Sequence, residues 1–98
     1  MISREEAISQ VRNIKKHLGA QKAFLFGSVA RAEQHELSDV DVLFVMETTK
    51  RFHDRLIDVW DACDSHFPIE PLVYTPHEFE RMKDTRALEF MLEGSVEI

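Results

Sequence analysis

Two short apolar segments constrain the fold most strongly, because the chain between them leaves room for only one kind of connection. Lys22–Phe26 and Asp39–Met46 are both typical of strands, the first ending at Gly27 and the second rich in Val, Leu and Phe. Asp39 follows Gly27 by only twelve positions, which is too few for a helix to cross a sheet and return to the same end. We therefore expect antiparallel strands, with the end of the first lying beside the start of the second.

Apolar residues at helical spacing predict two long helices. The first is expected to begin at Ser3, which has capping-box spacing with Glu6, and to end at Gly19. The second is predicted over Arg51–Phe67. Its apolar face comprises Phe52, Leu56, Val59, Trp60, Cys63 and Phe67. We expect Trp60 and the phenylalanines to pack in the core rather than to stack on a nucleic-acid base.

A third strand and a short connecting helix complete the central part of the fold. Ile69–Tyr74 is expected to be a strand, and its Pro71 favours a place at or near a sheet edge. The long helix before this strand permits parallel pairing with the second strand. Ser28–Gln34 is expected to be a short helix or turn.

The C-terminal part of the chain predicts two more helices and a final strand. Thr75–Glu78 has Thr, Pro and Glu at the N-cap, first and third positions of a helix. Ala87–Leu92 is expected to be helical, with Gly94 ending it and Val96–Ile98 forming a last strand. Residues 1–98 therefore predict a single domain of the α/β class, in which a small mixed β-sheet is flanked by helices.

Composition excludes several classes of protein. The 98 residues are 44% hydrophobic and 31% charged, as in an ordinary globular domain. Twelve basic and eighteen acidic residues give a net charge of -6, which argues against broad nucleic-acid binding. No apolar run suits a signal peptide or a membrane span, and the single cysteine, Cys63, permits no internal disulfide. A cytoplasmic protein without a membrane segment is expected.

Acidic residues at the starts of the second and third strands predict a cation site. Asp39 and Asp41 are two positions apart in a strand, so their side chains project to the same face. Carboxylates this close repel each other unless a cation lies between them, and oxygen ligands suit Mg²⁺. Glu70 opens the neighbouring strand and would add a third acid. Three acids could bridge two Mg²⁺ ions about 3.5–4 Å apart, the arrangement that supports nucleotidyl transfer.

Gly27, Ser28 and Arg31 supply complementary features for binding phosphate. Glycine lets the backbone approach an anion closely. Ser28 lies where the short helix is expected to begin, and the backbone N–H groups at the start of a helix are free to bind phosphate. Arg31, one turn later, could donate to a triphosphate oxygen as a charge-assisted donor.

Together these residues resemble the signature of a known family. Gly27-Ser28, ten residues, and then Asp39-Val40-Asp41 is similar to the motif of the DNA polymerase β-like nucleotidyltransferases. The longer stretch FGSVARAEQHELSDVDVLFV resembles the minimal nucleotidyltransferases, and IEPLVYTPHEFERM resembles their third-strand region. The resemblance spans about Lys22 to Met82 and implies the nucleotidyltransferase fold, α-β-α-β-α-β-α.

The resemblance implies roles for the acidic residues. Asp39 and Asp41 take the place of the family's catalytic, metal-binding acids. Glu70 takes the place of the third acid, which is commonly Asp and is therefore one methylene shorter. Mg²⁺, as two ions, and ATP are the implied cofactor and substrate.

The resemblance also implies a nucleotide-binding role for the turn after the first strand. Gly27 and Ser28 take the place of the nucleotide-phosphate contacts, and Arg31 matches the arginine of the family's GSxAR stretch. Ala32 departs from the pattern, because a glycine often follows that arginine.

Two functions from different classes follow from the resemblance. Minimal nucleotidyltransferases are often paired with a HEPN-domain partner in toxin–antitoxin modules. The first function is therefore AMP transfer from ATP onto a HEPN-type partner protein, as the antitoxin of the pair. The alternative is a non-catalytic antitoxin or interaction module that neutralises its partner by binding alone.

Either function needs a protein partner, because a domain this small has no second lobe to bind an acceptor. We predict that part of an apolar surface near the C-terminus contacts another chain, either a HEPN-type partner or a second copy of this chain. The residues of this surface are Phe79, Phe90, Met91 and Val96–Ile98.

Overall fold

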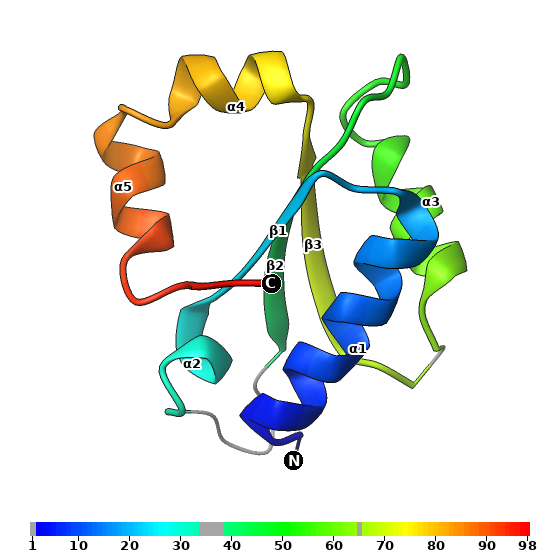
Figure 1. The fold of residues 1–98 in the computed structure, drawn as a ribbon, viewed down its shortest axis with the longest axis vertical. Helices are drawn as coiled ribbons and strands as arrows, with labels where there is room; N and C mark the ends of the chain where they lie inside the picture. Colours follow the sequence, from blue (N-terminus) through cyan, green and yellow to red (C-terminus); the bar gives the residue numbers. More distant parts are fainter. Residues whose placement is uncertain (1, 34–38, 65) are drawn as a thin grey trace.

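A four-stranded mixed sheet forms the centre of the structure, with strand order β3-β2-β1-β4 (Figure 1). The strands are β1 (Lys22–Phe26), β2 (Val40–Val45), β3 (Ile69–Tyr74) and β4 (Val96–Glu97). β1 pairs antiparallel with β2 and with β4, whereas β2 pairs parallel with β3. The short connection after β1 therefore predicted its orientation correctly, and the proline-bearing strand β3 lies at a sheet edge as expected.

Helices flank this sheet in the predicted α/β arrangement. The structure is a computed structural model that describes residues 2–33, 39–64 and 66–98. Its helices are α1 (Arg4–Leu18), α2 (Gly27–Ala30), α3 (Arg55–Ala62), α4 (Pro76–Met82) and α5 (Arg86–Leu92). The Ser3 hydroxyl caps α1 and left-handed Gly19 ends it, as the sequence predicted. The end of the predicted Ser28–Gln34 turn, Gln34, lies outside the described residues.

Alternating side chains of the strands divide the core into two layers. In β2, Val42 and Phe44 face the layer covered by α1 and α3, whereas Leu43 and Val45 face α4 and α5. The first layer is the larger one and includes Ala7, Val11, Ile14, Leu25, Val59 and Val73. Asp41 alternates with Val40 and Val42 and therefore projects toward the α4 and α5 side of the sheet.

The second long helix is shorter than predicted. The sequence predicted Arg51–Phe67, but α3 covers only Arg55–Ala62. Cys63 has an extended backbone, and the carboxylate of Asp64 accepts a hydrogen bond from the His66 backbone N–H at 2.9 Å. A side chain that satisfies the backbone two residues later forms a turn, and this turn competes with continuation of the helix.

The predicted apolar face of α3 is only partly covered. Val59 is buried, but Trp60 leaves 51% of its surface exposed, so the expectation that Trp60 packs in the core is wrong. Phe52 precedes α3 and packs against the ring of Tyr74 instead, with ring centroids 5.7 Å apart. Helical spacing marks a residue's face but does not show whether another element covers it.

A buried arginine, which the sequence analysis did not identify, ties three elements together. The Arg55 guanidinium donates to the carbonyl oxygens of Lys50 at 3.0 Å and Val73 at 3.1 Å. It also forms two hydrogen bonds to the Glu78 carboxylate, at 2.6 and 3.2 Å. Glu78 completes the predicted capping box of α4 with Thr75. The starts of α3 and α4 are thereby joined to the C-terminal end of β3.

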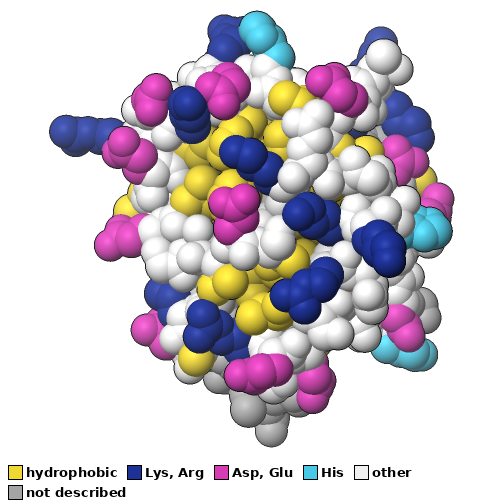
Figure 2. Space-filling model, viewed as in Figure 1, with side chains coloured by type: hydrophobic (Ala, Val, Ile, Leu, Met, Phe, Trp, Pro, Cys, Tyr) yellow, Lys and Arg dark blue, Asp and Glu magenta, His cyan; other side chains and the backbone are white. Residues whose placement is uncertain are grey.

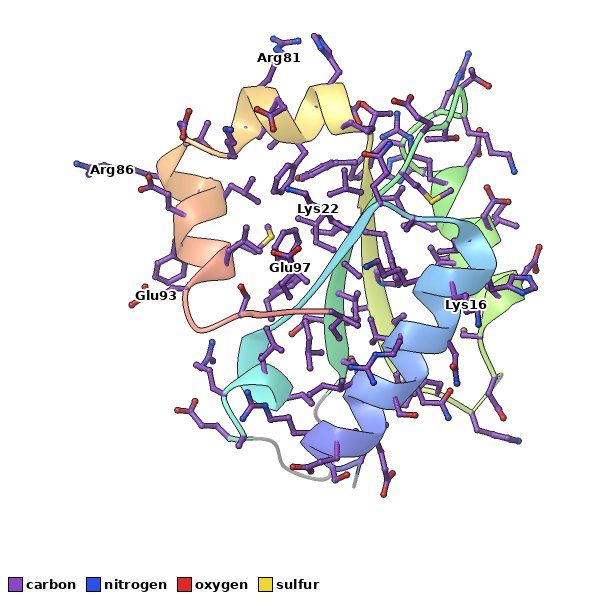
Figure 3. All side chains as sticks on the ribbon, in the orientation of Figure 1. Lys16, Lys22, Arg81, Arg86, Glu93 and Glu97 are labelled. Atoms are coloured by element: carbon purple, nitrogen blue, oxygen red, sulfur yellow. The ribbon has the colours of Figure 1, made fainter. Side chains whose placement is uncertain are left out.

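Much of the predicted contact surface near the C-terminus is covered within the chain. Phe79 is 7% exposed and stacks on Phe24 at 5.6 Å between ring centroids, and Lys22 lies over the same ring (Figure 3). Met91 is half-buried against the smaller core layer. Phe90 remains 80% exposed. The expectation of an exposed surface is therefore confirmed for Phe90 and wrong for Phe79.

The C-terminal tail forms the predicted last strand. Val96 pairs with Leu25 of β1, and the Ile98 backbone N–H donates to the Ala23 carbonyl oxygen at 2.8 Å. The Lys15 ammonium donates to the Ile98 carbonyl oxygen, also at 2.8 Å. The backbone of the tail is therefore bound to the sheet and to α1, and Val96–Ile98 is a sheet edge rather than a free arm.

The surface mixes charges of both signs. The face seen in Figure 2 carries basic and acidic side chains with apolar surface between them, and several basic side chains gather across its centre and right. Arg81 and Arg86 project outward from α4 and α5 (Figure 3). None of the helices in the described ranges combines the length and apolar character that crossing a membrane requires.

Candidate active site

The sheet register places the predicted acidic residues side by side. Asp41 of β2 is the partner of Phe26 in antiparallel β1 and of Glu70 in parallel β3. Register partners on adjacent strands project from the same face and lie close together. The end of β1 and the starts of β2 and β3 therefore meet at one edge of the sheet, as the sequence predicted. Asp39, directly before β2, lies at the same edge.

Gly27 lies directly against the Asp41 carboxyl group. Its φ angle is +75°, in the left-handed region that glycine adopts without strain. A Cβ atom at this position would collide with the Asp41 carboxylate and lie 3.1 Å from its Cγ atom. Only a glycine thus allows α2 to begin immediately beside the acidic residues.

Ser28 is the second residue of the short helix α2, and Arg31 is its C-cap. Ser28 is half-buried, and its carbonyl oxygen accepts a hydrogen bond from the Glu33 backbone N–H at 2.8 Å. Arg31 is exposed, and its Nε donates to the Glu33 carboxylate at 3.1 Å. Burial raises the pKa of Asp41, and the Arg31 charge opposes this rise, so the guanidinium lies within electrostatic reach of the acids.

The three carboxyl groups act on one another. A hydrogen bond and the negative charge of Asp39 raise the pKa of Glu70, and Asp41 raises it further. Burial raises the pKa of Asp41, and the charge of Asp39 adds to this effect, whereas a hydrogen bond from Glu70 opposes it. Mutually repelling carboxylates of this kind share a proton or bind a cation. Glu70 is therefore in contact with both aspartates.

The donor chemistry fits Mg²⁺, although the side chains are not arranged as a finished cage. Within residues 2–33, 39–64 and 66–98, no three His, Cys, Asp or Glu side chains are already positioned to ligate one ion. Asp39 and Asp41 each interact with Glu70. Asp39 and Glu70 are exposed, so their side chains have room to turn toward a shared cation. The metal site remains a prediction supported by an oxygen-only donor set.

Two hollows lie beside these acids, and Trp60 lines both. One has a volume of about 470 Å³, and its lining is Phe26, Asp41, Leu56, Trp60, Ile69, Glu70, Pro71, Leu72 and Met91. The other, of about 570 Å³, is lined by Asp39, Trp60, Cys63, Asp64, Phe67, Pro68, Ile69 and Glu70. Trp60 was not predicted from the sequence to lie beside the acids. Its signal was a large aromatic side chain on the helix that leads to the strand bearing Glu70.

Comparison with known proteins identifies the family of this chain. The profile of the nucleotidyltransferase domain family matches residues 8–96 of this chain. This chain belongs to the nucleotidyltransferase domain family. A crystal structure from Sulfolobus solfataricus, provisionally described as a nucleotidyltransferase, is similar at 25% sequence identity and a TM-score of 0.54. The similarity covers 86% of this chain and 84% of that one. No curated protein sequence matches significantly.

Family membership confirms the nucleotidyltransferase fold and supports nucleotidyl transfer as the general activity. The match from residue 8 to 96 includes every residue that the sequence assigned to the site. The match is to the family as a whole. It specifies neither the nucleotide, the metal and the acceptor nor a toxin–antitoxin pairing.

Proposed function

We propose that this nucleotidyltransferase moves AMP from ATP onto a hydroxyl group of a partner protein, with Mg²⁺ as cofactor. The observation that carries the proposal is the register that sets Asp41 beside Glu70, with Gly27 directly against the Asp41 carboxylate. Paired carboxylates next to a close-approaching glycine backbone suit a metal–triphosphate complex.

Each residue has a distinct role in the proposed reaction. Asp39 and Asp41 hold the metal ions, and Glu70 completes the set. Ser28 and the backbone around Gly27 position the triphosphate, and Arg31 leaves Glu33 to bind a phosphate oxygen. When bound, Mg²⁺ would offset the negative charge of the phosphates.

The transfer is a single in-line displacement. The acceptor oxygen forms a bond to the α-phosphorus, and the bond from that phosphorus to the oxygen bridging the α and β phosphates breaks. Pyrophosphate leaves with the electron pair of that bond. The proton of the acceptor hydroxyl passes to a carboxylate oxygen of Glu70, which acts as general base. A HEPN-type toxin is the acceptor that the resemblance to minimal nucleotidyltransferases favours.

The test is binding followed by turnover. Titration of ATP into the protein by calorimetry should show binding with Mg²⁺ that is much weaker after chelation. Addition of the product of the neighbouring gene should release pyrophosphate. ATP binding that is insensitive to chelation and to Asp41→Asn would overturn the metal and nucleotide assignment.

A second candidate is a partner-binding module without transfer, and Phe90 favours it. This side chain is 80% exposed on α5, with Arg86, Glu89, Leu92 and Glu93 beside it. A large exposed aromatic ring is typical of a contact with another chain. Under this candidate, Asp41→Asn would still neutralise the partner and the partner's mass would not change.

A further inference from the structure

Trp60 lies at the outer edge of the sheet, next to the acidic residues. Leu56 and Trp60 are one helical turn apart on α3, and both line the hollow of about 470 Å³ beside β3. Ile57 is as exposed as Trp60, at 52% and 51%, but lines neither of the two hollows beside the acids. Of these two exposed side chains of α3, only Trp60 therefore faces the hollows beside the acids.

The hollow follows the open edge of β3. Within the described ranges, β3 pairs only with β2, so its other edge has no strand beside it. Ile69 and Pro71 line the hollow from one face of β3, and Glu70, which alternates with them, lines it from the face that it shares with Asp41. Pro71 lacks a backbone N–H, which discourages a further strand from pairing there. The groove thus suits side chains of an incoming segment rather than an added strand.

The order of residues across the sheet indicates which substrate enters here. Gly27 and Ser28 follow β1, Asp41 belongs to β2 and Glu70 to β3, with Trp60 beyond β3. In an in-line displacement the attacking and leaving oxygens lie on opposite sides of the phosphorus. If the departing phosphates bind at the β1 side, the acceptor approaches from the β3 side, where the groove lies.

The charge of the lining restricts the partner. Every charged residue that lines either hollow beside the acids is acidic: Asp39, Asp41 and Glu70 at the centre, and Asp64 at the end of α3. The central three would be offset by bound cations, but Asp64 lies outside that group. Such a rim favours basic partners and slows the approach of acidic ones.

We propose that the groove formed by Leu56, Trp60, Ile69 and Pro71 binds the acceptor, as an apolar segment that is flanked by basic residues and presents its hydroxyl group to Glu70. This inference rests on the proposed function only for the reaction of the hydroxyl group. Binding of the segment depends on the apolar and acidic lining of the groove.

Trp60 is the single tryptophan of the chain, so its fluorescence reports the groove directly. The probe is a synthetic peptide of alternating leucine and lysine around one serine, and the matched control peptide has glutamate in place of each lysine. We expect the basic peptide to shift Trp60 emission to shorter wavelength, saturably and without ATP, and the acidic peptide to cause no shift.

Variants of α3 distinguish binding in this groove from non-specific binding to exposed apolar side chains. By calorimetry, Trp60→Ala should bind the basic peptide about tenfold more weakly or worse, and Trp60→Phe should recover most of the loss. Ile57→Ala, which removes an equally exposed side chain from the same helix, should bind like the wild type. Equal weakening by Ile57→Ala, or no preference for the basic peptide, would overturn the inference.

The same variants distinguish failure of the groove from failure of the proposed function. Transfer to a partner protein with an unchanged KM for that partner in Trp60→Ala would overturn the groove and leave the transferase intact. Trp60-dependent peptide binding without any nucleotidyl transfer would support the groove and overturn the proposed activity. A shift of Trp60 emission by Mg²⁺-ATP alone would assign the groove to the base and overturn the inference.

Discussion

Asp41 and Glu70 are direct partners in the parallel register between β2 and β3. The pairing gives the candidate site its shape, because it brings a third carboxyl group to the two aspartates from a strand that lies far along the sequence. Gly27 reaches the same point from β1, where any side chain would collide with the Asp41 carboxylate.

Gly27→Ala should impair both nucleotide binding and folding. The new methyl group meets the Asp41 carboxylate at a positive φ angle, so we expect a loss of about 1–3 kcal/mol in unfolding free energy. Gly19→Ala is the matched control, because Gly19 also has a positive φ of 66° but no atom within 4 Å of the added methyl. Chemical denaturation and ATP titration of both variants provide the measurement. Loss of ATP binding in Gly19→Ala as large as in Gly27→Ala would contradict the account.

Ser28→Ala should weaken nucleotide binding with little effect on stability. Ser28 is at the start of α2, next to the Gly27 that lies against Asp41, and we expect an affinity loss of about three- to tenfold, the worth of one hydrogen bond to a phosphate. Calorimetric titration with Mg²⁺-ATP measures this loss, and thermal unfolding without nucleotide checks the fold. Unchanged affinity and unchanged turnover would make Ser28 a structural residue.

Glu78→Gln should reduce stability in a manner that depends on pH. The hydrogen bonds from Arg55 hold the pKa of Glu78 below its ordinary value of 4.5. The ionised carboxylate therefore stabilises the folded state above that value, and its contribution is lost as pH falls through the lowered pKa. Because Glu78 is partly exposed, we expect a difference of about 1–2 kcal/mol near neutral pH.

The measurement is the unfolding free energy of wild type and Glu78→Gln at several pH values from neutral to acid. The difference in unfolding free energy between wild type and Glu78→Gln should become smaller once the pH falls below 4.5. Glu80→Gln is the control, because the Glu80–Lys83 pair is exposed and solvent screening leaves it little effect on stability. A gap that is constant with pH, or equal for the two variants, would refute this role for the Arg55–Glu78 pair.

Phe90→Ser should disrupt contact with another chain without destabilising the monomer. The ring is exposed on α5, so its removal costs no core packing. Analytical ultracentrifugation of the chain, alone and with the product of the neighbouring gene, should show association in the wild type that is at least tenfold weaker in the variant. A wild-type chain that stays monomeric and binds no such product would contradict the partner prediction.

The topology was predictable because the length of a connection and the position of a proline, both local features of the sequence, limit how strands can pair. Twelve positions between Gly27 and Asp39 left only an antiparallel connection, and Pro71 marked β3 as an edge strand. The long helix before β3 permitted a parallel pair with β2, and the two pairings together predicted that Asp41 and Glu70 meet at one edge of the sheet. The pairing of specific residues within that edge then came from the register.

Features that depend on distant partners could not be predicted in the same way. Arg55 is buried because Glu78 and the Val73 carbonyl receive its guanidinium, and neither is adjacent to it in the sequence. Trp60 lies one helical turn after the half-buried Leu56, yet 51% of its surface is exposed. Periodicity therefore indicated the face of α3 correctly but did not indicate where that face ends and the groove begins.

The most direct test of the central claim is the intact mass of the acceptor after reaction. The chain is incubated with Mg²⁺, ATP and the product of the neighbouring gene, beside a parallel reaction with Asp41→Asn. We predict that the acceptor gains one or more AMP groups with equal release of pyrophosphate. Asp41→Asn should lower the rate by a factor on the order of 100 or more while keeping its fold by circular dichroism. An unchanged acceptor mass with every NTP, or an equal gain with Asp41→Asn, would contradict the account.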